Sequence, residues 1–171
     1  MITLLLGGAS SGKSALAESM APESGVTYIA TAVAGDPDMA ARIEAHRARR
    51  PAGWATIEAE AGLASVIRAT PGFILVDSLT TWVAGSPGFA VAGGELCRAL
   101  VERGGDSLVV SDEVGMGVHP STEPGRRFRE ALGAVNQAVA AVAGEVLLVV
   151  AGRSLRLDPS PRIRSGTAPL A

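Results

Sequence analysis

A run of residues near the start of the chain constrains its fold more than any other feature. It consists of Gly7, Gly8, Ala9, Ser10, Ser11, Gly12, Lys13 and Ser14, and it matches the phosphate-loop pattern G-x-x-x-x-G-K-[ST] at every defined position. The apolar residues 2–6 before it predict a buried strand, and residues 14–20 after it predict a helix. Loop amides and the positive end of that helix face the same anion in such an arrangement. The motif therefore predicts binding of the phosphates of a purine nucleoside triphosphate.

Two side chains of this loop and one carboxylate elsewhere predict a metal site. Lys13 is expected to reach the β- and γ-phosphates, and Ser14 to ligate Mg²⁺. Asp77 follows the apolar residues 73–76, and ligands of open parallel sheets bind at the carboxyl ends of the strands. We therefore expect Asp77 to hold Mg²⁺ directly or through water. The alternatives are a glycine turn without a ligand, and an Asp77 that merely caps the segment after it.

Apolar runs alternate with helical patterns along the rest of the chain. Strands are expected at residues 26–30, 54–58, 73–76, 107–111 and 146–151, and helices at 36–49, 59–68, 95–103 and 124–143. This alternation predicts an α/β fold of the P-loop NTPase-like (RecA-like) kind, a single domain with a mainly parallel sheet flanked by helices. We expect the nucleotide-binding domain at residues 1–157, an irregular tail at 158–171 and a loop at 84–94.

Charge and composition exclude several classes of protein. The formal net charge is −2, which argues against a general binder of nucleic acid or membrane surfaces. The single cysteine, Cys97, allows neither an internal disulfide nor a thiolate metal site. No apolar run approaches the ~18–20 residues of a membrane helix, and no basic leader precedes the first apolar run. We therefore expect a cytoplasmic protein with no membrane insertion and no nucleic-acid partner.

His46 stands out because the chain holds only two histidines. It lies late in the expected helix 36–49, and Arg42 and Arg50, four residues away on either side, share its helix face. Arginines neutralise phosphate charge and disfavour protonation of the imidazole, which keeps the ring nucleophilic. The alternative is a solvated basic face with a bystander histidine, and the spacing alone leaves both open. The other histidine, His119, is expected to be structural or to contact substrate.

Several further stretches occur in a characteristic order. The more specific ones are Met39-Ala40-Ala41-Arg42-Ile43 with His46, Arg50-Pro51 and Trp54, and then Glu113-Val114-Gly115-Met116-Gly117. Others are Tyr28-Ile29-Ala30-Thr31, Val76-Asp77, Arg127-Phe128-Arg129 and Val135-Asn136-Gln137. With these stretches and the phosphate loop, the sequence resembles the family of bifunctional adenosylcobinamide kinases / adenosylcobinamide-phosphate guanylyltransferases of cobalamin biosynthesis. The resemblance covers most of the chain up to Gly152.

The resemblance implies two reactions. The first moves the γ-phosphoryl group of ATP or GTP to the aminopropanol hydroxyl of adenosylcobinamide, and the second moves GMP from GTP to that phosphate and releases pyrophosphate. It also implies that His46 carries the guanylyl group and that the enzyme is a homotrimer. By position, it implies further nucleotide contacts at Ala30, Thr31, Ala32, Arg47, Ala48, Arg49, Arg50 and Glu58. Glu58 can accept the N1–H and N2 amine of guanine; the alternative is an exposed carboxylate at a strand end.

The chain also departs from the family pattern. Ser10 stands where relatives often carry arginine, the stretch between Trp82 and Glu95 is short, and the tail after Gly152 has no recognisable match. Glu113 is expected either to orient a metal-bound water or to cap a turn. Two other functions stay open: a P-loop kinase for another small metabolite, and a non-catalytic nucleotide switch.

Overall fold

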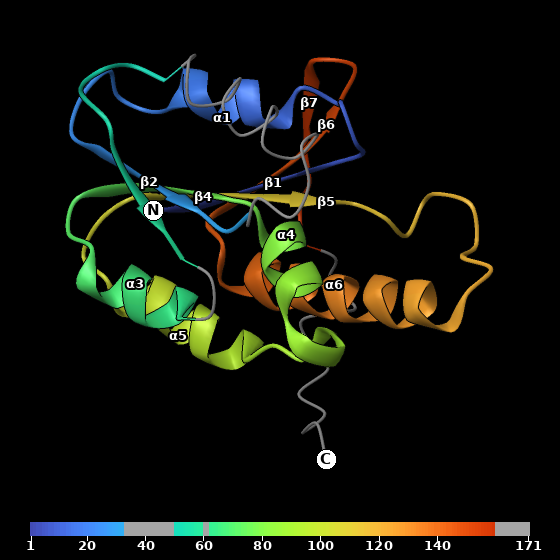
Figure 1. The fold of residues 1–171 in the computed structure, drawn as a ribbon. Coiled ribbons are helices and arrows are strands. Elements are labelled where there is room, and N and C mark those ends of the chain that lie inside the picture. Colours follow the sequence, from blue (N-terminus) through green and yellow to red (C-terminus); the bar gives the residue numbers. More distant parts are fainter. Residues whose placement is uncertain (33–49, 60–61, 160–171) are drawn as a thin grey trace.

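Figure 1 shows a sheet with helices on both of its faces. The computed structural model describes residues 1–32, 50–59 and 62–159. Within these residues, one seven-stranded sheet has the strand order β3-β2-β4-β5-β1-β6-β7, and every neighbouring pair is parallel except β6 and β7. The strands are β1 Ile2–Gly7, β2 Val26–Ala30, β3 Ala55–Glu58, β4 Phe73–Asp77, β5 Ser107–Asp112, β6 Glu145–Val150 and β7 Arg153–Arg156. This confirms the expected mainly parallel α/β fold.

Helices bury the central strands from both sides. Helix α1 (Lys13–Met20) covers one face, and the other face carries α3 (Leu63–Ala69), α4 (Leu79–Gly85), α5 (Gly93–Glu102) and α6 (Glu123–Val142) (Figure 1). Leu4 and Leu5 of β1 are both fully buried and belong to separate apolar clusters on the two faces, because successive strand side chains point in opposite directions. No helix in the described ranges combines the length and hydropathy needed to cross a membrane.

Most expected elements are present, but one helix begins later than expected, and one helix and one strand were not expected. Helix α3 begins at Leu63, later than expected. Helix α4 was not expected; Ser78 starts it as an N-cap whose side chain accepts a hydrogen bond from the Thr81 amide, a common helix start. Strand β7 was also missed; it follows β6 through a turn in which Ala151 and Gly152 have φ of +51° and +72°, as in tight hairpins. The helix expected at 36–49 lies outside the described residues.

The expected loop at 84–94 is partly ordered into regular structure. A 3₁₀ turn spans Pro87–Phe89, and α5 already begins at Gly93. The ring of Phe89 packs edge-to-face against Phe128 of α6, with ring centroids 5.5 Å apart. This short connection therefore packs against α6.

The strand order decides which residues meet at the functional edge. Because β1 to β6 are parallel, their carboxyl ends lie along one edge of the sheet. Strand β5 lies between β4 and β1. The carboxyl end of β5, Asp112, is therefore nearer to the phosphate loop than Asp77 at the end of β4.

Candidate active site

The phosphate loop joins the end of β1 to the start of α1. Gly12 precedes the helix with φ +94°, a left-handed conformation that favours glycine. The Ser11 amide donates to Gly8 O (3.2 Å) within the loop, and the Gly152 amide of the β6–β7 turn donates to Ser11 O (2.8 Å). A Cβ on Gly7 would lie 2.4 Å from Val149 O. The neighbouring strand and hairpin therefore fix the loop in shape.

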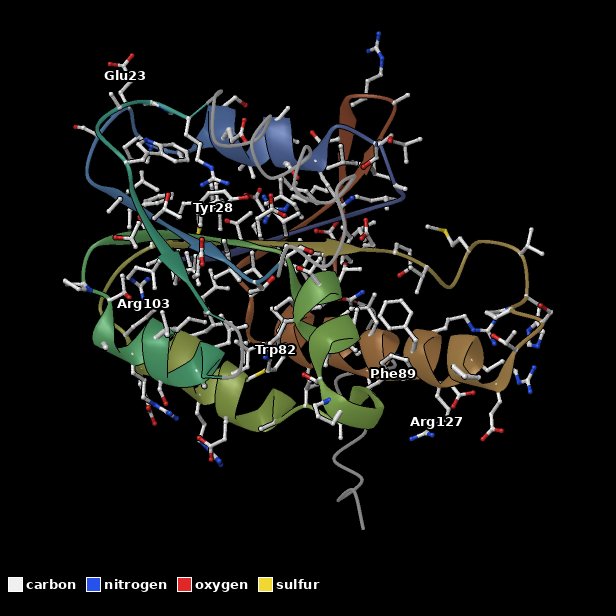
Figure 2. All side chains as sticks on the ribbon, in the orientation of Figure 1. Glu23, Tyr28, Trp82, Phe89, Arg103 and Arg127 are labelled. Atoms are coloured by element: carbon white, nitrogen blue, oxygen red, sulfur yellow. The ribbon has the colours of Figure 1, made fainter. Side chains whose placement is uncertain are left out.

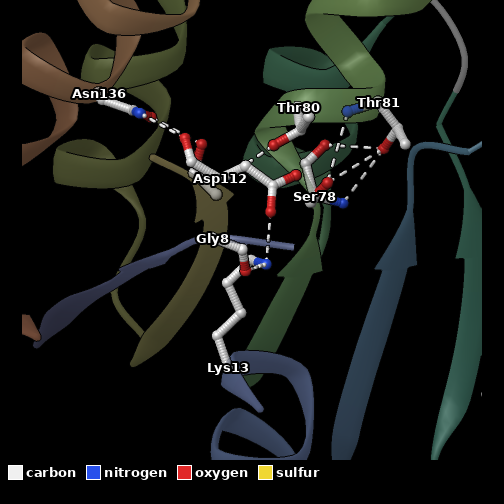
Figure 3. Close-up of polar contacts among 8 residues, drawn as sticks. Gly8, Lys13, Ser78, Thr80, Thr81, Asp112 and Asn136 are labelled. Carbon is white, nitrogen blue, oxygen red and sulfur yellow. Dashed lines mark hydrogen bonds and ion pairs between the residues drawn. The ribbon is translucent and has the colours of Figure 1, made fainter. Parts of the chain in front are cut away.

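The side chain of Lys13 lies beside Gly8 of this loop (Figure 3). Its Nζ forms an ion pair with Asp112 Oδ1 and donates to Gly8 O at 3.0 Å. The side chains are 10% and 24% exposed, respectively, so the pair is largely shielded from solvent. A phosphate bound in the loop competes with Asp112 for the same ammonium group. Asp112 is thus an anionic side-chain partner of Lys13.

Asp112 is itself fixed by hydrogen bonds from two helices. Its backbone amide donates to Thr80 Oγ1 of α4 (2.8 Å), and its carbonyl accepts from Asn136 Nδ2 of α6 (3.0 Å). Ser111 Oγ donates to Asn136 Oδ1 at 2.6 Å (Figure 3). Sequence reasoning did not select Asp112 as a partner of Lys13. The available signal was an aspartate directly after a buried strand, but only the strand order reveals that this strand adjoins β1.

The carboxylate of Asp77 accepts a hydrogen bond from a tyrosine. Tyr28 of β2 donates from its hydroxyl to Asp77 Oδ2 at 2.8 Å. The Arg50 guanidinium lies over the ring of Tyr28, 3.3 Å from the centroid, and Arg50 Nη1 donates to Thr56 Oγ1 of β3 at 3.2 Å. Burial, with the nearby Asp77 carboxylate, raises the pKa of Tyr28 well above its ordinary value. Tyr28 is therefore a hydrogen-bond donor at any working pH.

The turn after β2 lies beside the end of β4. The Thr31 amide donates to Asp77 O at 3.3 Å. The Ser78 amide donates to Thr31 Oγ1 at 2.9 Å, and Thr31 Oγ1 lies 2.6 Å from Thr81 Oγ1. Ala30 and Ala32 flank this contact and are half-buried. The structure therefore brings residues 30–32 to the same sheet edge as the phosphate loop and Asp77.

The remaining expected site residues lie further out or are not described. Glu58 is exposed at the end of the edge strand β3, where it pairs in register with Ala30 of β2. His46, Arg47, Ala48 and Arg49 lie outside the described residues. His119, in the loop after β5, contacts Arg129 of α6 through its Nδ1 at 3.1 Å. Glu113 accepts a hydrogen bond from the Gly115 amide at 2.6 Å, so its carboxylate caps a local turn.

The donors at this edge fit Mg²⁺ bound together with phosphate. Ser14 is a half-buried hydroxyl in the first turn of α1, and Asp77 supplies a carboxylate; hard oxygen donors suit this ion. Within the described part of the chain, Ser11 Oγ is buried and has no hydrogen-bond partner. The described ranges contain no group of three or more His, Cys, Asp or Glu that could hold a metal.

A phosphate loop at the carboxyl edge of a mostly parallel sheet places the chain among P-loop nucleotide-binding proteins. Comparison with known families narrows this class. A family model described as cobinamide kinase / cobinamide phosphate guanyltransferase matches residues 3–157. The chain belongs to this family of bifunctional enzymes, which confirms the resemblance seen in the sequence.

Curated relatives match over almost their whole length. A protein of Pseudomonas aeruginosa named bifunctional adenosylcobalamin biosynthesis protein CobP is 43% identical over 172 residues, which cover 94% of this chain and 99% of the relative. The bifunctional adenosylcobalamin biosynthesis protein CobU of Salmonella typhimurium is 38% identical, covering 92% and 99%. Among solved structures, the P4 protein of bacteriophage phi6 in complex with ADP matches with TM-score 0.44 and 20% identity, covering 90% of this chain and 52% of that one.

Proposed function

We propose that this chain phosphorylates adenosylcobinamide with ATP or GTP and then transfers GMP from GTP to the product, giving adenosyl-GDP-cobinamide and pyrophosphate. The observation that carries the proposal is the position of Lys13, whose ammonium group contacts Gly8 O of the phosphate loop and Asp112. The chain belongs to the cobinamide kinase / guanyltransferase family. Both reactions place negative charge on a phosphate leaving group, and the loop is suited to stabilise that charge in either case.

In the first reaction, the substrate hydroxyl oxygen attacks the γ-phosphorus, and the bond to the β–γ bridging oxygen breaks. The hydroxyl proton passes to solvent, and ADP or GDP leaves. Lys13 exchanges Asp112 for the phosphates, and amides of the phosphate loop contact the same oxygens. Ser14 and Asp77 would hold Mg²⁺, which would supply positive charge to neutralise the phosphates. Positioning and charge neutralisation supply most of the catalysis in such transfers.

In the second reaction, we assign His46 as the nucleophile. Its neutral imidazole attacks the α-phosphorus of GTP, the α–β bridging bond breaks, and pyrophosphate leaves into the phosphate loop. An oxygen of cobinamide phosphate then attacks the same phosphorus, the phosphorus–nitrogen bond breaks, and the imidazole is regenerated. The loop that binds a γ-phosphate in the first reaction thereby binds the leaving group in the second.

Further parts of the proposal concern recognition and organisation. Residues 30–32 and 47–50 contact the nucleotide, and Glu58, exposed at the end of β3, accepts hydrogen bonds from guanine. Residues 1–157 form the catalytic domain and 158–171 a tail; the family match ends at residue 157, which supports this boundary. We further propose that the enzyme assembles as a homotrimer and acts in the cytoplasm on small molecules, without a nucleic-acid partner.

The test is product analysis by mass spectrometry. Wild-type protein is incubated with adenosylcobinamide, Mg²⁺ and GTP, and we expect a phosphorylated product followed by one that carries GDP. Lys13→Ala should reduce both products by at least about 100-fold, a loss typical of a group that stabilises transition-state charge. Arg98→Ala is the control, because Arg98 is an exposed cation on α5 that pairs with Glu95.

The outcomes separate the candidate functions. A phosphorylated corrinoid without the GDP product indicates a simple kinase. Slow nucleotide hydrolysis without any corrinoid product indicates a nucleotide switch. Undiminished activity of Lys13→Ala removes the phosphate loop from the mechanism.

A further inference from the structure

Tyr28 connects two parts of the molecule that sequence reasoning treated separately. It is the only tyrosine of the chain, and its side chain lies in the layer between the sheet and α1 (Figure 2). In the sheet, Tyr28 pairs in register with Leu75 of β4, two residues before Asp77. Two strand residues span about 6.6 Å, a distance that only a long side chain bridges. The phenol therefore reaches the end of the neighbouring strand and meets Asp77 Oδ2 at 2.8 Å.

The ring of Tyr28 is also held from its face. Arg50 stacks 3.3 Å above the ring centroid and is itself tied to Thr56 of β3 by a 3.2 Å hydrogen bond. A guanidinium over an aromatic face is an attractive arrangement. Tyr28 is also buried, with 3% of its surface exposed. The ring cannot swing away, so the direction of its O–H is set by the surrounding structure.

We propose that Tyr28 is a positioning residue for the metal site: its hydroxyl fixes the Asp77 carboxylate in the orientation in which Asp77 holds Mg²⁺. This inference rests on the proposed function, in which Asp77 and Ser14 bind the ion. Carboxylate ligands are commonly oriented by a hydrogen bond from a second residue, and loss of that partner typically weakens metal binding about 10- to 100-fold. The Tyr28–Asp77 bond has the geometry of such a contact.

The test measures metal binding directly, with Mn²⁺ as the probe and GDP as the nucleotide. Mn²⁺ is titrated into the protein–GDP complex and followed by electron paramagnetic resonance. Tyr28→Phe keeps the ring beneath Arg50 and removes only the hydroxyl that bonds Asp77. We expect Mn²⁺ affinity to fall about 10- to 100-fold, while GDP binding in EDTA stays within about twofold of wild type, because the phosphate loop is untouched.

A double-mutant cycle shows whether Tyr28 acts through Asp77. We expect Asp77→Asn to weaken Mn²⁺ binding, and Tyr28→Phe added to Asp77→Asn to cause no further loss. Arg98→Ala is the control; Arg98 is an exposed residue of α5 that pairs with Glu95, and its removal should leave Mn²⁺ affinity unchanged. Wild-type Mn²⁺ affinity in Tyr28→Phe would overturn the inference, as would an equal loss in the Asp77→Asn background.

Failure of the proposed metal site is a separate outcome. If Asp77→Asn alone binds Mn²⁺ as wild type does, the metal assignment fails, and the role of Tyr28 fails with it. A second measurement does not depend on any variant folding. Because Tyr28 is the only tyrosine, protein labelled with ¹³Cζ-tyrosine gives a single NMR signal. We expect that signal to shift when Mg²⁺ is added to the GDP complex, and an unmoved signal would count against the proposal.

Discussion

Gly7→Ala probes the steric demand that β6 places on the phosphate loop. An alanine Cβ there would lie 2.4 Å from Val149 O and 2.6 Å from Ser11 Oγ. The Ser11 side chain can rotate away, but Val149 O belongs to the backbone of β6, which pairs with β1 at this position. Relief therefore requires the strands to shift. Overpacking of this kind costs about 1–3 kcal/mol, and for a protein of this size each kcal/mol lowers Tm by about 2–4 °C.

Thermal unfolding without nucleotide measures this cost. We expect Gly7→Ala to lower Tm by roughly 2–12 °C, from the two ranges above. The adjacent glycine supplies the matched control, because a Cβ on Gly8 meets no atom within 4 Å. Gly8→Ala should change stability by less than about 0.5 kcal/mol. A wild-type Tm for Gly7→Ala, or an equal loss in both variants, would refute the steric argument.

Two further predictions concern Asp112, which pairs with Lys13, and Asn136, which donates to the Asp112 carbonyl. Asp112→Asn replaces a charge-assisted contact to Lys13 with a neutral one, which weakens that contact by about 1 kcal/mol. GDP should therefore bind about fivefold tighter in a fluorescence titration. Unchanged or weaker GDP binding would contradict the competition between Asp112 and phosphate for Lys13. Asn136→Ala leaves the buried Ser111 hydroxyl without its acceptor and should destabilise the protein by about 1–3 kcal/mol. A urea midpoint equal to that of wild type would exclude this role for Asn136.

Local patterns predicted the strands of the sheet well. Strands were predicted at residues 26–30 and 73–76, and the structure forms β2 Val26–Ala30 and β4 Phe73–Asp77 there. Helix α4 was missed because its residues, Leu79–Gly85, form a short segment rich in threonine and small residues, without a clear helical repeat. Strand β7 was missed because all its residues are exposed and it has no apolar run; its main local signal is the glycine of the hairpin turn.

The contacts that organise the site were beyond sequence reasoning. The phosphate loop is a local motif, so its residues and its place between β1 and α1 could be predicted. Lys13 and Asp112, by contrast, meet only because β5 inserts between β4 and β1. Tyr28 and Asp77 lie 49 residues apart in the chain. No periodicity or spacing encodes such pairs, because they depend on strand order and register.

The central claim is that one phosphate loop serves transfer at both the γ- and the α-phosphorus, with His46 carrying GMP in the second case. Incubation with GTP labelled on the α-phosphate, followed by denaturation, tests it most directly. We predict protein-bound label that is labile in acid and stable in alkali, as expected for a phosphoramidate, and its absence from His46→Ala, which should still phosphorylate adenosylcobinamide. Wild-type protein without label, or equal labelling of His46→Ala, would contradict the account.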